Sequence, residues 1–265
     1  MDTDTFFSLA VSTIYVIAAV LLFRYVAAPS VMRQRALTLM AAVGWLLQGW
    51  LLHRLIDTSS GQNLSLLNVA SMVGWLMIGL SLAWRQWSTF PLIVFTVLVA
   101  NIVIQPIATI DHGERLFSLQ GQPYAVIHVL LALTGYSFLA LSAIHALTVL
   151  VQDHRLKQHQ AKHQPWLPPI LSAELWLFRL LVMSFVSLTL SYLAVFAGGW
   201  HILSTQPAHK LVLSLLSWGL VAALIAGHRT FGWRGPVAAR WTLAAFILLV
   251  LAYFGTWAIL SLRTG

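Results

Sequence analysis

Ten histidines are the side chains of this sequence best suited to bind a metal or a cofactor. Six of them lie inside long apolar runs or at their ends. Hydrogen bonds at the headgroups account for His53 and His201, which leaves His128, His145, His209 and His228. Ionisable side chains in such positions usually have a partner and often a function. Neutral imidazoles on facing helices suit the iron of a haem, so we treat these four residues as candidate haem-binding residues.

The spacing of the four histidines predicts two levels along the membrane normal. His128 and His145 are 17 residues apart, nearly five helical turns, so they cannot bind one small ligand together. His209 and His228 are 19 residues apart. That is about 28 Å along a helix, close to the thickness of a bilayer's apolar core. We expect His145 and His228 to share one level and His128 and His209 to share the other.

Tryptophans are the second group of candidates, because a porphyrin requires an apolar wall of ring-stacking side chains. The chain has 12 of them. Aromatic belts at the two membrane interfaces explain most of them equally well. We expect Trp200 and Trp218 to line the haem sites, with His128 and His228 as axial ligands of the haem iron.

Other chemistries lack the residues that they need. The absence of cysteine excludes disulfides, thiolate metal sites and attachment of haem through thioether bonds to this chain. There is no Gly-rich phosphate loop, no HExxH zinc motif, no serine nucleophile motif and no pair of carboxylates within an apolar run. We therefore expect the protein not to be an enzyme.

The composition indicates which kind of fold positions these residues. Of the 265 residues, 59% are hydrophobic and only 8% are charged, with a mean hydropathy of +0.83. Soluble domains have about a quarter of their residues charged, so this is a polytopic membrane protein in contact with the lipid bilayer. The net charge of +8 is typical of orientation signals in membrane loops, and no DNA-binding motif indicates a nucleic-acid partner.

Hydropathy predicts an all-α bundle of about eight transmembrane helices, which form one domain over residues 1–265. The connectors contain helix breakers, as in TSSGQN, DHGERLFSLQGQP and GWRGP. The predicted spans are Phe6–Phe23, Ala36–Leu52, Leu66–Trp84, Phe90–Ala108, Ala125–Val151, Leu175–Ala197, Leu211–Gly227 and Trp241–Leu262.

Lysine and arginine are divided unevenly between the two sets of span ends. Eleven of the 15 lie at one set of ends and the other four at the opposite set. Because basic residues accumulate in cytoplasmic loops, the richer set should face the cytoplasm. Both termini are then predicted to be extracytoplasmic. His128 and His209 would lie near the outer face, and His145 and His228 near the inner face.

Three stretches together resemble the cytochrome c assembly, or haem-handling, membrane protein family. They are SGQNLSLLNVASMVGWL, then HVLLALTGYSFLALSAIHAL with the basic loop and LPPILSAELWLFRLL after it, and finally HKLVLSLLSWGLVAALIAGHRTFGWRGPVAARWTLAAFILLVLAYFG. They extend over about three quarters of the chain. Their order and spacing are similar to the small eight-span, YpjD-type branch of that family in the bacterial inner membrane.

The resemblance implies roles for particular residues. His128 matches the family's outer histidine ahead of the long span, and His228 matches the inner histidine before the Gly-Trp turn. Lys210 matches a lysine of the family, whereas His209 is not implied as an inherited ligand. Trp200 is the remnant of a tryptophan-rich outer loop that this sequence otherwise lacks.

Two further histidines of the family pattern are missing. Leu47 or Gln48 stands where the inner histidine of the second span would fall, and no histidine follows the last span. Each level therefore keeps one of two family ligands.

These observations favour a multi-pass protein of the bacterial inner membrane that binds haem or passes it on in cytochrome c assembly, in contact with other membrane proteins. A site with one histidine suits transfer of haem better than storage. The second reading is a non-catalytic scaffold or regulator that has lost haem binding. The third is a transporter of a small solute or ion, for which Asn101, Gln105 and Pro106 are the hint. Gln48 and Asn68 can instead form hydrogen bonds between helices.

Overall fold

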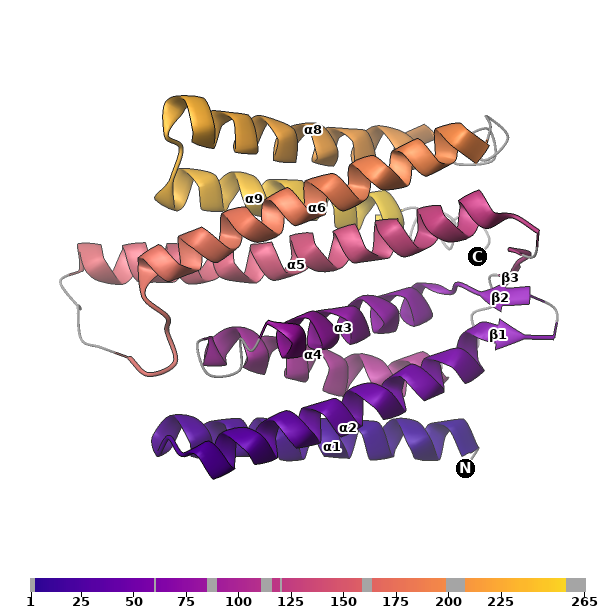
Figure 1. The fold of residues 1–265 in the computed structure, drawn as a ribbon, viewed down its shortest axis with the longest axis horizontal. Helices are drawn as coiled ribbons and strands as arrows, with labels where there is room; N and C mark the ends of the chain where they lie inside the picture. The colour runs from indigo at the N-terminus through magenta and orange to yellow at the C-terminus, as the bar shows by residue number, and fades with distance from the viewer. Residues whose placement is uncertain are drawn as a thin grey trace. The chain divides into compact units, whose positions relative to one another are not determined.

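The computed structural model describes residues 3–59, 61–84, 90–110, 116–119, 121–158, 164–198 and 208–255. Eight helices in these ranges are long and apolar enough to cross a membrane, which confirms the predicted all-α polytopic bundle (Figure 1). They are α1 (Thr3–Ala27), α2 (Val31–Ile56), α3 (Leu66–Ala83), α4 (Pro91–Ile110), α5 (Pro123–Lys157), α6 (Ile170–Gly198), α8 (Ala208–Phe231) and α9 (Gly235–Val250).

Most helices extend a few residues beyond the predicted apolar spans, because polar residues continue a helix into the headgroup region. The largest differences are at the end of α5, which reaches Lys157 and not the predicted Val151, and at the start of α9, which begins at Gly235 and not at the predicted Trp241. The prediction treated GWRGP as a helix breaker, but Pro236 occupies the first turn, where its missing N–H is not needed. A π-helical turn, Leu251–Gly255, follows α9, and the predicted end at Leu262 lies outside the described residues.

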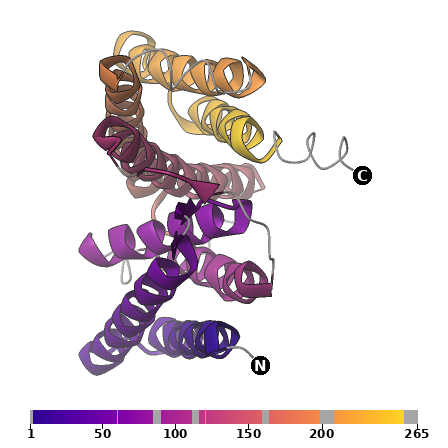
Figure 2. The same ribbon diagram turned by 90° about the vertical axis from the view of Figure 1, so that its right-hand side faces the viewer.

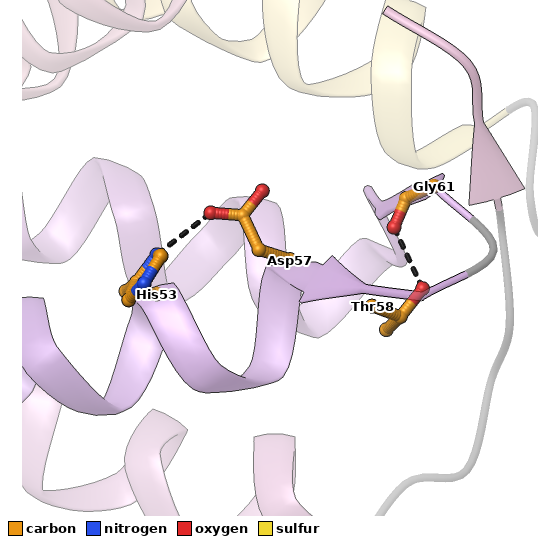
Figure 3. A network of polar contacts seen from close by, with 4 residues as sticks. All are labelled: His53, Asp57, Thr58 and Gly61. Atoms are coloured by element: carbon orange, nitrogen blue, oxygen red, sulfur yellow. Dashed lines mark hydrogen bonds and ion pairs between the residues drawn. The ribbon is translucent and has the colours of Figure 1, made fainter. Parts of the chain in front are cut away.

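A small sheet, which the sequence did not predict, joins two connectors. Its antiparallel strands β1 (Asp57–Thr58), β2 (Gly61–Asn63) and β3 (Leu116–Phe117) lie in the order β1-β2-β3. Figure 3 shows the turn between the first two, where the Thr58 hydroxyl donates to the carbonyl of Gly61 at 2.6 Å. Gly61 has a φ of 137°, which favours glycine at this turn.

The chain divides into two compact units of four helices each. Unit 1 comprises residues 1–120 and 163–168, with α1 to α4 and the sheet. Unit 2 comprises residues 121–162 and 169–265, with α5, α6, α8 and α9. In the connector that belongs to unit 1, the ring of Trp166 lies 4.6 Å from Phe23 and 6.1 Å from Phe95 between centroids. One domain over the whole chain stays a prediction.

In unit 1, α1 and α4 lie side by side and run in opposite directions (Figures 1 and 2). The ring centroids of Phe23 and Phe95 are 5.3 Å apart, and the Ser12 hydroxyl donates to the carbonyl of Ile102 at 3.3 Å. That carbonyl would normally accept the N–H of residue 106, but Pro106 has none. Ser12 therefore provides from α1 the hydrogen bond that the proline removes from α4.

Helices α2 and α3 of unit 1 are joined by a reciprocal tryptophan pair. The rings of Trp45 and Trp75 stack with centroids 4.9 Å apart. Each indole N–H donates to the backbone carbonyl of the other tryptophan, at 3.1 Å from Trp45 and 2.8 Å from Trp75. Each ring also covers a glycine of the opposite helix, Gly79 under Trp45 and Gly49 under Trp75. We call this arrangement the tryptophan clasp.

The core of unit 2 collects small and branched apolar side chains from all four of its helices. In this unit α5 and α6 pack along much of their length, and α9 packs against both α5 and α8. Three serines of α6 face this packing, and Ser184 donates to the carbonyl of Gly135 on α5 at 2.9 Å. Fully buried core residues include Leu139, Ala146, Leu177, Leu181, Val221, Leu224, Ala239 and Ala245.

Candidate functional site

His228 is held where the end of α8 meets the start of α6. Its ring stacks on Phe178, with centroids 3.7 Å apart and an interplanar angle of 19°. Its Nδ1 lies 2.8 Å from the carbonyl oxygen of Trp233, which follows α8 in the turn to α9. The imidazole is thus fixed by two contacts, one to a neighbouring helix and one to the turn.

The Gly-Trp-Arg-Gly turn beside His228 folds in a way that requires its glycines. Gly232 and Gly235 have φ values of 67° and 59°, which other residues adopt rarely. The N–H of Trp233 donates to the carbonyl of Gly227 at 3.2 Å, and the indole lies against Gly227, where a side chain would overlap it. A carboxylate oxygen of Glu174 accepts the N–H of Gly235 at the start of α9.

His128 is held at the other end of unit 2, between α5 and α6. Its Nδ1 lies 3.1 Å from the carbonyl oxygen and 2.8 Å from the hydroxyl of Ser191, which is buried. The same hydroxyl lies 3.1 Å from the carbonyl of His128 and can donate its one proton there. A carbonyl oxygen only accepts, so Nδ1 of His128 is the donor to Ser191.

The hydrogen bonds assign the same tautomer to both histidines. In His128 and in His228 an Nδ1–H donates to a backbone carbonyl, so in the neutral ring the lone pair is on Nε2. Histidines that bind metals usually donate their other N–H in this way, which fixes the orientation of the ring and increases its basicity. Among the described residues, no hydrogen bond involves the Nε2 of either ring.

The two histidines belong to different levels of unit 2. His128 contacts Ser191 and His228 contacts Phe178, and these two residues of α6 are 13 positions apart. At 1.5 Å per residue the levels are separated by about 20 Å. One iron atom cannot bind both rings, so His128 and His228 define two separate candidate sites.

His145 lies near the level of His228. It is completely buried in α5, one turn beyond Ser142, whose hydroxyl donates to the carbonyl of Leu177 at 3.0 Å. Because α5 and α6 run in opposite directions, His145 faces the segment around Glu174 and is within about one turn of the Phe178 level. The pairing of His145 with His228 stays a prediction.

His209 is not at the level of His128. It is exposed in the first turn of α8. Farther along α8, the Nε1–H of Trp218 donates to the hydroxyl of Thr189 on α6 at 2.9 Å, which sets the register of the two helices. Extending this register places His209 about 10 Å along the helix axis beyond Ser191, the residue that holds His128.

Of the two tryptophans proposed to line the sites, Trp218 is described and Trp200 lies outside the described residues. Trp218 stacks on Phe185, with centroids 5.3 Å apart, and meets Tyr192 edge to face at 6.4 Å. These rings join α6 to α8 between the levels of His128 and His228. The role of Trp218 in lining a haem site stays a prediction.

Lys210 provides positive charge near the His128 level. Its ammonium lies 5.4 Å from the centroid of the Tyr253 ring and is close enough to His128 to act on it electrostatically. A cation in this position suits a ligand with carboxylate groups, as haem has. Within the described part of the chain, no three His, Cys, Asp or Glu side chains converge as a bare metal ion would require. Haem supplies four ring nitrogens itself and needs only one or two ligands from the protein.

Sequence reasoning did not identify Ser191 or Phe178. A signal for Ser191 was present, because Ser184, Ser187 and Ser191 recur at spacings of three and four and form one small-residue stripe on α6. Such stripes indicate close helix contacts in membranes. Phe178 carried no comparable signal, because apolar aromatic residues are frequent throughout the helices.

Comparison with known proteins supports the resemblance found in the sequence. The family described as cytochrome C assembly protein matches residues 35–261. The inner membrane protein YpjD of Escherichia coli K12 is 32% identical over 204 residues, which cover 76% of both chains. A 28.8 kDa protein from the nifR3-like 5′ region of Azospirillum brasilense is 30% identical over 136 residues, 49% of both chains.

No solved structure gives a significant match to this chain. The similarity to YpjD and the eight membrane-spanning helices show a multi-pass protein of the inner membrane. The family match extends over all of α3 to α9, including His128, His228 and the glycine turn. The chain therefore belongs to the cytochrome c assembly protein family.

Proposed function

We propose that this protein binds haem at two sites and passes it on during cytochrome c assembly. The observation that carries the proposal is the common tautomer of His128 and His228, each of which is a donor at Nδ1 and an acceptor at Nε2. Family membership supports the choice of haem as ligand. The chain itself makes or breaks no covalent bond in this proposal.

The residues of the chain would hold the ligand as follows. His128 and His228 would hold the haem iron through Nε2, Ser191 and Trp233 would fix the orientation of the two imidazole rings, and Trp218 would supply an apolar contact. Haem, when bound, supplies the iron and the macrocycle that the assembly reaction delivers to a cytochrome. Lys210 would neutralise a propionate at the His128 level.

Two separate sites, each with one histidine, support transfer of haem over storage. A site that holds haem through one histidine would leave room for a residue of an acceptor protein to take the haem over. The levels are about 20 Å apart along α6, so each would exchange haem on its own side of the bilayer. His145 is fully buried in α5, about one helical turn from the level of Phe178, and is the candidate for a second ligand at the His228 site.

A spectroscopic titration tests the proposal. Detergent-purified protein is titrated with haem, and the Soret band is recorded in the oxidised and reduced states. We expect two haems per chain for the unchanged protein, one for His128→Ala or His228→Ala, and none for the double variant. His53→Ala is the matched control, since His53 is exposed and pairs with Asp57 at 2.7 Å (Figure 3).

A variant can lose haem because it misfolds or because it lacks the histidine ring that binds the iron, and these two causes must be separated. In His228→Gly, added imidazole should restore the band, because it replaces only the missing ring. Absence of any Soret band in the unchanged protein would refute the proposal. If one partner protein then co-purified in stoichiometric amount, the result would favour the scaffold reading.

We also propose that the ends rich in arginine face the cytoplasm and both termini the outside. Arg33 supports this assignment, since at the turn between α1 and α2 it donates to the backbone carbonyl of Ala28 and adds to the positive charge of Arg24. The chain has no cysteine, so single cysteines at Arg155 and Arg234 can be labelled from one side at a time. Labelling from the extracytoplasmic side would reverse the assignment.

A further inference from the structure

Unit 1 has a buried polar network that the haem proposal does not use. Five side chains from its four helices take part: Tyr15, Gln48, Ser71, Asn101 and Gln105 are all fully buried. The Tyr15 hydroxyl donates to Gln48 at 2.6 Å, and the Gln48 amide donates to Asn101 at 3.0 Å and to the carbonyl of Ser71 at 3.1 Å. Gln105 donates to the Ser71 hydroxyl at 2.6 Å.

Two polar atoms near this network have no partner among the described residues. They are Oε1 of Gln105 and the hydroxyl of Ser8, both in fully buried residues. Exchanging the two ends of the Gln105 amide would leave its nitrogen unpaired in place of its oxygen, so one end lacks a partner in either orientation. An unpaired buried polar atom destabilises the fold, and a bound polar molecule that pairs with it would remove this cost.

The helix register places the two unpaired groups at the same level. Ser12 on α1 contacts Ile102 on α4, and the two helices run in opposite directions. Ser8 is four residues before Ser12, so it lies opposite the segment three to four residues after Ile102, which contains Gln105. The unpaired hydroxyl and the unpaired amide end therefore lie across one helix contact.

A polar stripe on α1 connects this level to the end of unit 1. Asp4, Ser8, Ser12 and Tyr15 follow one another at spacings of four, four and three residues. At 100° per residue they lie within about 80° of one another around the helix. Asp4, in the first turn of α1, pairs with the partly exposed Arg54 at 3.0 Å. A polar route thus leads from the first turn of α1 to the buried network.

We propose that Ser8 and Gln105 form a hydrated site, entered from the Asp4 end of unit 1, that binds water or a small neutral solute with both donor and acceptor groups. A bare cation is disfavoured, because it would need more oxygens than the two unpaired groups supply and the site has no buried carboxylate at its level. Water needs only two to four polar partners. The site is independent of the haem sites, which lie in unit 2.

Cysteine labelling tests the site in the full-length chain. Ser8→Cys and Leu9→Cys place single thiols at the same depth, but Leu9 is 43% exposed on the surface of α1 and so faces lipid. Only a hydrated thiol ionises readily and reacts with a charged methanethiosulfonate reagent. In open membranes we expect Ser8→Cys to react about ten times faster or more than Leu9→Cys. Adding Gln105→Leu should slow the reaction of Ser8→Cys.

A competition experiment completes the test. If excess acetamide slows the labelling of Ser8→Cys, the site takes a small solute, and rapid labelling without competition assigns it to water. Equal labelling of Ser8→Cys and Leu9→Cys would overturn the proposal.

Discussion

The tryptophan clasp of unit 1 allows one prediction to be worked out in detail. In Gly79→Ala, the new methyl group would lie 2.8 Å from Nε1 and 3.1 Å from Cε2 of Trp45. The indole must move away, and it then loses its hydrogen bond to the carbonyl of Trp75 and part of the ring stack. Gly49→Ala has the same effect on Trp75, because its methyl group would lie 2.9 Å from that Nε1.

The magnitude follows from the separate contributions. A hydrogen bond between membrane helices contributes about 0.6 kcal/mol on average, and a ring pair about 0.5–1.5 kcal/mol. Replacing glycine by alanine in a helix interior by itself stabilises the helix by about 0.8–1 kcal/mol, because alanine has the higher helix propensity. Gly219→Ala is the matched control, since a methyl group there would meet nothing within 4 Å. Relative to this control, we expect Gly79→Ala to lose about 1.5 kcal/mol of stability.

Thermal unfolding in detergent measures the difference. For a chain of this size, about 1.5 kcal/mol corresponds to a decrease of roughly 3–6 °C in Tm. Because both glycines act on one shared ring stack, the double variant Gly49→Ala/Gly79→Ala should lose less than the two single variants together. If Gly79→Ala were as stable as Gly219→Ala, or if the two glycine effects simply added, the clasp would not act as one unit.

Three further variants test individual contacts by the same thermal assay. Gln48→Leu leaves several buried polar atoms unpaired and should cost about 2–3 kcal/mol. Ser12→Ala should cost about 1 kcal/mol in the natural chain but almost nothing together with Pro106→Ala, because alanine restores the N–H that proline lacks. Glu174→Ala should cost about 1 kcal/mol by removing the acceptor for the N–H of Gly235, whereas Glu174→Gln keeps an acceptor and should cost less.

Each of these variants has a result that contradicts its reasoning. If Gln48→Leu were as stable as the unchanged protein, the hydrogen bonds of Gln48 to Tyr15, Ser71 and Asn101 would not contribute to stability. An equal cost of Ser12→Ala with and without Pro106→Ala would show that the serine does not replace the missing helix bond. For Glu174, equal losses in the alanine and glutamine variants would indicate a role for its charge in place of its oxygen.

Hydropathy and helix geometry were sufficient to predict the eight spans and to separate His128 from His228 along the membrane normal, but the register of α8 against α6 does not support the expected pairing of His209 with His128. The spans follow from apolar runs of about 20 residues, and the levels follow from a rise of 1.5 Å per residue. Gln48 was expected to bond between helices and does so, to Ser71 and Asn101. For Asn68 the same expectation was wrong, because its amide caps the preceding segment through the carbonyl of Asn63.

The partners of these residues could not be predicted, because they depend on the register between helices that are distant in sequence. Ser191 is 63 residues from His128, and nothing near either residue specifies which turns of α5 and α6 meet. The pairing of the sheet could not be predicted for the same reason. Strand β3 pairs with β2 from more than 50 positions away, and each strand is only two or three residues long. Short pieces of this kind have no periodicity for sequence analysis to detect.

The position of Trp166 has a consequence for biogenesis. A membrane chain is synthesised and inserted from its first helix onward, so Phe23 and Phe95 reach the bilayer long before the tryptophan that packs on them. Unit 1 must keep this surface open while the 35 residues of α5 emerge from the ribosome. Its final closure therefore waits for the translation of the second half to begin, which ties the maturation of the two halves together in time.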